Sequence, residues 1–336
     1  MDKFSKAKGL LEPFYKNNIK INYSPPNGYR SRCEFGYRDS HYTMFDTNGN
    51  RIYLDSFEIA RPSIFNLMPL MLNEINQCIL LNKKLFQVNF RTNNQDKIMA
   101  SLVYHKQLDR EIKEKALKIA NKLEIIIILR AKKEFYSTHE ELLIDRLEEF
   151  NINLFQTDQS FYQPNHFHMP EMIKKVISFI DKPQDLLELY CGSGTFTIPL
   201  SKYFANIFAT ESNRQSIRCL NKSIQESNIT NIEHARLSAE EVSEAFNGRI
   251  FRRMAETNIA DYNFSHILVD PPRSGIGKEV AEVAQLFNNI IYVSCNYETF
   301  TSDMLLLKNH KINHIEIYDQ FPNTKHLEIV SLLSKI

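Results

Sequence analysis

One of the five cysteines in this 336-residue chain follows an apolar run and precedes a helical pattern. The run at 291–294 leads into Cys295 and Asn296, and the helical spacing begins at Tyr297. Free N–H groups at a helix start stabilise a thiolate, so we expect a lowered pKa and a nucleophilic Cys295. A cysteine taken alone is more often a small buried apolar residue.

A carboxylate near the end of the chain would complete the chemistry of such a thiol. Glu328 follows His326 and Leu327 at the start of the last apolar run. Addition of a thiolate to C6 of uracil makes C5 nucleophilic towards a methyl sulfonium. A base must then remove the C5 proton, so that the thiol leaves by elimination. Cys295 and Glu328 therefore suit methylation of uracil at C5, although spacing alone also fits a solvated Glu328.

A glycine-containing turn follows an earlier strand pattern, in the segment ELYCGSGT at 188–195. Its glycines let a ligand approach the backbone, and the following helix start offers free N–H groups. Glu211 lies 17 residues after Gly194 and is placed to accept both hydroxyls of a ribose. The third glycine of dinucleotide-binding turns is missing, which favours S-adenosylmethionine over NAD. A mere tight turn is the remaining alternative.

Two prolines follow another strand pattern, in the segment VDPPRSG at 269–275. They fix the backbone, so Asp270 and Arg273 would be presented rigidly at the edge of a sheet. Related loops with an aromatic residue in place of Arg273 hold flipped bases for methylation at nitrogen. Methylation of a base amino group is therefore a second candidate function, and a plain Pro-Pro turn is the structural alternative.

Two kinds of secondary-structure pattern position these residues. Before residue 165, strand patterns at 85–89 and 98–104 and a helical pattern at 109–123 predict an antiparallel α+β region. After it, strand and helix patterns alternate, which predicts a doubly wound parallel α/β sheet of Rossmann type. The strands are expected at 185–190, 207–210, 232–237, 266–269, 290–294 and 312–318, and the helices at 196–204, 214–227, 278–287 and 297–307. Such sheets bind ligands beyond the carboxyl ends of their strands.

The charges divide in the same way, although the net charge is only +1. Residues 1–136 hold 23 Lys and Arg against 14 Asp and Glu, a net charge of +9, and the remainder holds 18 against 26, a net charge of −8. A basic first part suggests contact with a polyanion, while a mixed solvated surface is the alternative. We therefore predict a basic α+β RNA-binding domain over 1–160 and a catalytic domain over 161–336.

The cysteines also restrict the class of protein. They are odd in number, scattered and without a C-x-x-C pair, which argues against disulfides, a zinc site or another metal site, and an iron-sulfur cluster. The N-terminus lacks the apolar run of a signal peptide, and no stretch has the length of a membrane span. We expect a cytoplasmic protein with no membrane contact and no obligate protein partner.

The segments resemble the tRNA (uracil-5-)-methyltransferases of the TrmA type over nearly the whole chain. The resemblance is carried by Glu211 and by FYQPN at 161–165, DLLELYCGSGTF at 185–196, VDPPRSG at 269–275, VSCNYET at 293–299, YDQFPNTKHLE at 318–328, YRSRCEFGY at 29–37, KLFQVNF at 84–90 and LVYHKQLD at 102–109. It implies a class I methyltransferase fold, Cys295 as nucleophile and Glu328 as proton acceptor. It also implies S-adenosylmethionine contacts at Gln163, Tyr190, Thr195, Glu211 and Asp270.

The implied substrate is the T-loop uridine at position 54 of transfer RNA, which must leave its stack to react. Stacking on Phe86 and His105 and phosphate contacts from Arg30 and Arg32 would offset that cost. A core aromatic and a surface histidine are the alternatives for Phe86 and His105. Other RNAs with a T-loop-like hairpin, such as ribosomal RNA or tmRNA, stay open as substrates, as does an RNA-binding protein without catalysis.

The chain departs from the family pattern at several positions. Tyr297 replaces the usual proline two residues after the nucleophile, Thr195 replaces a common asparagine, and Ile-Val rather than Cys-Gly follows Glu328. The family members that act on ribosomal RNA carry an N-terminal cysteine cluster and often a β-barrel domain. This chain shows neither, which favours the transfer-RNA branch. The basic insert from Gly248 to Ser265 is open to two interpretations, an RNA contact or a solvated loop.

Overall fold

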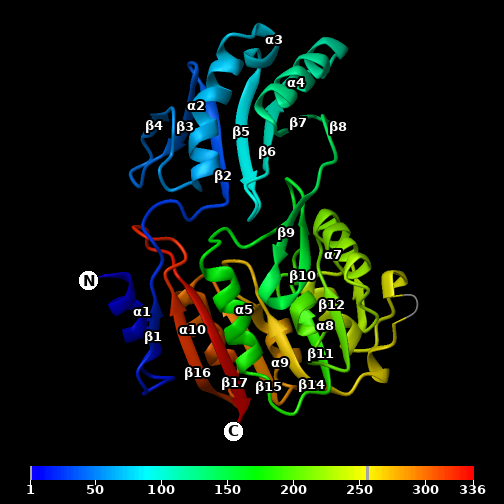
Figure 1. Ribbon diagram of the computed structural model, residues 1–336. Helices are drawn as coiled ribbons and strands as arrows, with labels where there is room; N and C mark the ends of the chain where they lie inside the picture. The colour runs from blue at the N-terminus through cyan, green and yellow to red at the C-terminus, as the bar shows by residue number, and fades with distance from the viewer. Residues whose placement is uncertain (1, 255–256) are drawn as a thin grey trace.

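The computed structural model describes residues 2–254 and 257–336, and it contains two main sheets, one above the other in Figure 1. The larger sheet has the strand order β1-β16-β17-β15-β14-β11-β12-β13. Its strands are β1 (Lys20–Asn22), β11 (Asp185–Leu189), β12 (Asn206–Thr210), β13 (Ile232–Ala235), β14 (Phe264–Val269), β15 (Asn289–Ser294), β16 (His310–Tyr318) and β17 (Glu328–Lys335). In the described part of the chain, no helix is both long enough and apolar enough to cross a membrane.

Helices cover both faces of this larger sheet, because its central strands are apolar on both sides. One core contains Val242, Val280 and Phe300, and the opposite core contains Ile173 and Leu220. The first face is covered by α1 (Lys3–Leu11), α8 (Ala239–Phe246), α9 (Gly277–Ala284) and α10 (Tyr297–Leu306), and the second by α5 (His168–Ser178), α6 (Thr197–Leu200) and α7 (Arg214–Glu226). The predicted doubly wound α/β fold is confirmed, with one addition: β17 runs antiparallel to both neighbours.

The smaller sheet has the strand order β4-β3-β2-β5-β6-β7-β8. Its pairs are antiparallel except β6 with β7, which α4 (Arg110–Leu123) connects. Together with α2 (Pro62–Asn76) and α3 (Ile79–Asn82), α4 buries one apolar face of the sheet. The strands are β2 (Arg32–Arg38), β3 (His41–Phe45), β4 (Arg51–Leu54), β5 (Leu85–Thr92), β6 (Ile98–Tyr104), β7 (Ile126–Ala131) and β8 (Glu134–Ser137). This is the α+β region expected from the sequence.

The structure divides the chain differently from a single boundary at residue 160. Strand β1 pairs in parallel with β16 at the edge of the larger sheet, and Ala7 and Leu11 of α1 lie in its core. The hairpin of β9 (Leu143–Leu147) and β10 (Ile152–Gln156) lies beside α7, where Phe155 N donates to Ser223 Oγ at 3.2 Å. Sequence patterns missed this because a three-residue edge strand is defined by its partner rather than by its own periodicity.

One helix also differs from its predicted length. The pattern at 196–204 forms only α6 (Thr197–Leu200), followed by turns. Beyond Leu200 the chain continues in a tighter turn, where Tyr203 N donates to Leu200 O at 2.9 Å. The apolar spacing of the segment therefore reflects burial on the sheet rather than a long helix.

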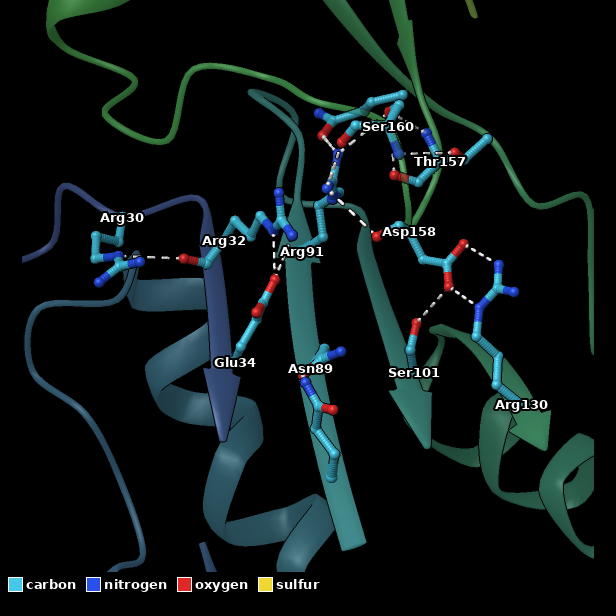
Figure 2. A network of polar contacts seen from close by, with 12 residues as sticks. Arg30, Arg32, Glu34, Asn89, Arg91, Ser101, Arg130, Thr157, Asp158 and Ser160 are labelled. Atoms are coloured by element: carbon cyan, nitrogen blue, oxygen red, sulfur yellow. Dashed lines mark hydrogen bonds and ion pairs between the residues drawn. The ribbon is translucent and has the colours of Figure 1, made fainter. Parts of the chain in front are cut away.

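A buried arginine joins the smaller sheet to the chain that enters the catalytic region (Figure 2). Arg91 on β5 donates to Gln156 Oε1 at 3.1 Å and to Ser160 O at 2.8 Å. Its burial lowers its pKa to about 10. Beside it, Arg130 on β7 pairs with the carboxylate of Asp158. Together these contacts fix segment 156–160, which leads directly into Phe161 and Gln163.

We expect Arg91→Met to lower the free energy of unfolding by about 3 kcal/mol, because the buried acceptors of Gln156 and Ser160 would lose their donor. Urea unfolding followed by circular dichroism measures the change. Arg38→Met removes the same charge from an exposed site on the same sheet and should stay within about 0.5 kcal/mol. Equal effects of the two substitutions would contradict a structural role for Arg91 at this joint.

Candidate active site

The reacting groups come from three neighbouring strand ends at one edge of the larger sheet. Strand β15 ends at Ser294, which pairs with Ile329 of the antiparallel β17. Continuing that register places Cys295 opposite Glu328. Strand β14 pairs in parallel with β15 and ends at Val269, so Asp270 emerges at the same edge. Because β17 is reversed, its first residue meets the last residues of its neighbours.

A cavity of about 530 Å³ opens at this edge and brings most of the predicted residues together. Its lining includes Gln163, Tyr190, Glu211, Asp270, Cys295 and Glu328. Arg273 also lines it and supplies a positive charge opposite the carboxyl groups. The cavity therefore holds both candidate reacting groups and four of the five residues expected to contact the cofactor.

The glycine-containing turn shapes one wall of this cavity. Tyr190 has a φ of 60°, a left-handed conformation that costs a bulky residue about 1 kcal/mol, and its side chain lines the cavity. Gly192 and Gly194 follow with φ values of 56° and 91°. Glu211 Oε2 accepts from Gly192 N at 3.1 Å, so this carboxylate is held against the turn. The arrangement suits the hydroxyls of a ribose.

Amide groups form another wall. Gln163 Nε2 donates to Asp270 Oδ2 at 3.3 Å, and Gln320 Nε2 donates to Gln163 Oε1 at 2.8 Å. Gln320 and Phe321 both line the cavity. They had no predicted role, although they stand in the YDQFPNTKHLE segment. Their place in the loop between β16 and β17 was the signal that could have identified them.

Thr195 is the one predicted cofactor residue outside the cavity lining. It is buried behind the turn, next to the start of α6. The turn presents Tyr190 to the cavity instead.

Burial dominates the electrostatics of the reacting pair. Burial and the carboxyl groups of Glu328 and Asp270 raise the pKa of Cys295 to about 12, and Arg273 opposes this shift. A backbone hydrogen bond lowers this pKa, but burial outweighs it, so the net shift is upward and not downward as expected. Burial next to Asp270 also raises the pKa of Glu328 well above its usual value, against the effect of Arg273. Among the described residues, Glu328 Oε1 has no hydrogen-bond partner.

The start of α10 holds the arginine loop beside the thiol. Asn296 caps the helix by accepting from Glu298 N at 3.1 Å. Its Nδ2 donates to Arg273 O at 3.1 Å, and Thr299 Oγ1 donates to the same carbonyl at 3.2 Å. Tyr297, which replaces the family proline, is the buried first residue of the helix. The side-chain cap starts the helix without proline.

The residues predicted to contact RNA lie in two places. The rings of Phe86 and His105 stack with centroids 4.0 Å apart, and Phe86 is partly exposed. Phe86 stands near the start of β5, the end away from the larger sheet (Figure 1). Arg30 lies over the ring of Phe321, with its Cζ 5.6 Å from the centroid, while Arg32 pairs with Glu34.

The arginines of the basic insert are partly occupied by neighbours. Arg249 pairs with Glu244, and Arg253 pairs with Glu241 of α8. Residues 255 and 256 of the insert lie outside the described residues. The observed pairs favour a structural part for Arg249 and Arg253 over an RNA contact.

The raised pKa of Cys295 predicts a particular pH dependence of its alkylation. With a pKa of about 12, the thiolate fraction rises about tenfold per pH unit across the accessible range. The rate of labelling by iodoacetamide should therefore keep rising from pH 7 to pH 10. Mass spectrometry of the labelled peptide measures it, with Cys295→Ala as the blank. A plateau near pH 8 would indicate a thiol that is not raised by burial.

Comparison with known proteins identifies the family of this chain. A sequence profile of the family described as tRNA (Uracil-5-)-methyltransferase matches residues 1–336. The chain is 35% identical to the tRNA/tmRNA (uracil-C(5))-methyltransferase of Saccharophagus degradans, over 99% of this chain and 95% of the relative. It is 38% identical to the Campylobacter concisus protein of the same name, over 95% and 89%.

A solved structure shares the fold. The Pyrococcus abyssi tRNA (uracil-54, C5)-methyltransferase in complex with S-adenosyl-L-homocysteine superposes with a TM-score of 0.74 at 19% identity, covering 98% of this chain and 82% of that one. The sequence profile spans the full chain, and the curated relatives match it at 35% identity or more. The chain therefore belongs to the tRNA (uracil-5-)-methyltransferase family.

Proposed function

We propose that this protein transfers a methyl group from S-adenosylmethionine to C5 of the T-loop uridine, position 54, of transfer RNA. The observation that carries the proposal is the placement of Cys295 opposite Glu328, in one cavity with Gln163, Glu211 and Asp270. The relatives are named for uracil-C(5) methylation of tRNA and tmRNA, which supports the same chemistry here. The T-loop-like hairpin of tmRNA is the second substrate to consider.

The cavity fits the cofactor, because its residues offer the groups that a nucleoside needs. Glu211, held by Gly192 N, would accept the ribose hydroxyls. Gln163, Tyr190 and Asp270 would hold the remaining parts, and Thr195 would support the turn from behind. When bound, S-adenosylmethionine supplies an electrophilic methyl group.

The chain's own residues would carry the other steps. The Cys295 thiolate adds to C6 of the uracil ring, and C5 then accepts the methyl group. Glu328 removes the C5 proton, and the bond between sulfur and C6 breaks as the double bond re-forms. Burial that raises the pKa of Glu328 also makes its carboxylate a stronger base. Arg273 favours the charged forms of both groups, because it lowers both pKa values.

The smaller sheet would supply the RNA contacts. Phe86 and His105 form a partly exposed stack on which a base can continue. Arg30, over Phe321, stands between this sheet and the cavity and would meet a phosphate near the extruded uridine. Arg32 would contribute once it leaves Glu34. The net positive charge of residues 1–136 also supports contact between this sheet and RNA.

Cys295→Ala should abolish uridine chemistry while leaving the cofactor cavity formed. With a tRNA transcript carrying tritium at uridine C5, we expect cofactor-dependent tritium release to fall on the order of a thousandfold or more, because no thiol activates C5. The matched control is Cys78→Ala, which removes a partly buried thiol of the smaller sheet. Methylation that persists in Cys295→Ala without tritium release would favour methylation of a base amino group instead.

Glu328→Gln should separate addition from elimination. Because glutamine cannot accept the C5 proton, tritium release should slow about a hundredfold while the covalent protein–RNA adduct accumulates. A denaturing gel of labelled tRNA measures the adduct. Loss of the adduct together with tritium release would show that Glu328 acts before the addition step. Undiminished tritium release would remove Glu328 from the mechanism.

A further inference from the structure

The first helix of the chain carries an almost fully buried ammonium group near the cavity. The side chain of Lys3 on α1 is only 11% exposed. Its Nζ donates to Asp319 Oδ1 at 2.5 Å, to Phe321 O at 2.9 Å and to His326 O at 3.0 Å. An ammonium has three hydrogens, so every donor of Lys3 is used.

The three acceptors lie at the two ends of one loop. Asp319 and Phe321 begin the connection from β16 to β17, and His326 ends it. Lys3 therefore ties the beginning of the loop to its end, and Glu328 follows only two residues after His326. The same loop contains Gln320, whose side chain holds the cavity residue Gln163.

Helix α1 also lines a second cavity that reaches the thiol. A cavity of about 730 Å³ adjoins the cofactor cavity, and Arg273 and Cys295 line both. Lys3, Phe4 and Lys6 of α1 form part of its wall. This second cavity therefore lies against both α1 and the thiol.

The position of α1 is fixed by its contacts with α10. Lys6 Nζ lies 2.7 Å from Glu298 Oε1 and 5.6 Å from the centre of the Tyr297 ring. Ala7 and Leu11 anchor the inner face of the helix in the core. Tyr297, the residue that departs from the family proline, thus provides a surface on which α1 docks.

A buried charge of this kind is expensive for stability, and an apolar side chain would fill the same space at lower cost. The three directed hydrogen bonds of Lys3 instead define one conformation of the loop 319–327. This loop leads directly into Glu328 at the start of β17.

We propose that Lys3 is a positioning residue for the proton-abstraction step, and that α1 forms the substrate-side wall of the active site. Lys3 holds the segment 319–327, so that Glu328 faces C5 of the uracil attached to Cys295. Glu328 can then accept the C5 proton as the sulfur–carbon bond breaks. This inference rests on the proposed uridine chemistry.

Lys3→Met should slow elimination more than addition. In single turnovers with C5-tritiated tRNA, we expect tritium release to fall between about tenfold and a hundredfold, because the base is displaced from its proton. The covalent adduct should form at a rate within about threefold of the unmodified protein and accumulate, as in Glu328→Gln. Lys16→Met, which removes a 75% exposed lysine from the same N-terminal segment, is the matched control and should change neither step.

Two results would overturn the proposal. Tritium release within twofold of the unmodified protein would show that Lys3 does not position the base. Addition and release falling in the same proportion, together with a lower melting temperature, would show a purely structural lysine. A merely structural role cannot produce accumulation of the adduct.

A second measurement separates this inference from the proposed function. Hydrogen exchange of the amides in 319–327, without RNA or cofactor, should be about tenfold faster in Lys3→Met and unchanged in Lys16→Met. Unchanged exchange in Lys3→Met would show that Lys3 does not hold the loop 319–327, even if the enzyme methylates uridine. If the unmodified protein released no tritium, the proposed uridine chemistry and the catalytic part of this inference would fail. The exchange result would still decide whether Lys3 holds the loop.

Discussion

The insertion of one reversed strand into an otherwise parallel sheet is the constraint on which this active site depends. Parallel strands present only their carboxyl ends at the ligand-binding edge. Because β17 runs the other way between β15 and β16, its first residue, Glu328, meets the end of β15 and Cys295. A nucleophile and a base 33 residues apart in sequence thus become neighbours through backbone hydrogen bonds, without a dedicated loop between them.

The same edge concentrates carboxyl groups in a poorly solvated cavity. Asp270, Glu328 and the Cys295 thiol all have raised pKa values, mainly because burial disfavours their charged forms. Arg273 is the cation that opposes these shifts at Cys295 and Glu328, and its carbonyl is held by Asn296 and Thr299 of α10. The start of α10 therefore also holds the Arg273 loop beside the thiol.

Side chains from distant parts of the chain hold this arrangement from two sides. On one side, Arg91 and Arg130 of the smaller sheet fix the segment that leads to Gln163. On the other, Lys3 fixes the loop that leads to Glu328. Both use buried cations on backbone carbonyls or carboxylates, which are directional and tolerate little displacement. Hydrogen bonds, and not apolar packing alone, thus couple the site to the smaller sheet.

The sequence by itself determined the alternation of strands and helices between residues 185 and 318, the place of Cys295 after β15, and the turn at 190–194. These features follow from local periodicity and from residue types at strand ends. Both can be recognised from residues that are close together in the sequence. Only the tertiary structure decided that β1 joins the larger sheet and α1 packs on it, that Thr195 lies outside the cavity lining, and that the pKa of Cys295 is raised. Strand partners and burial depend on residues far apart in the chain, so no local pattern carries them.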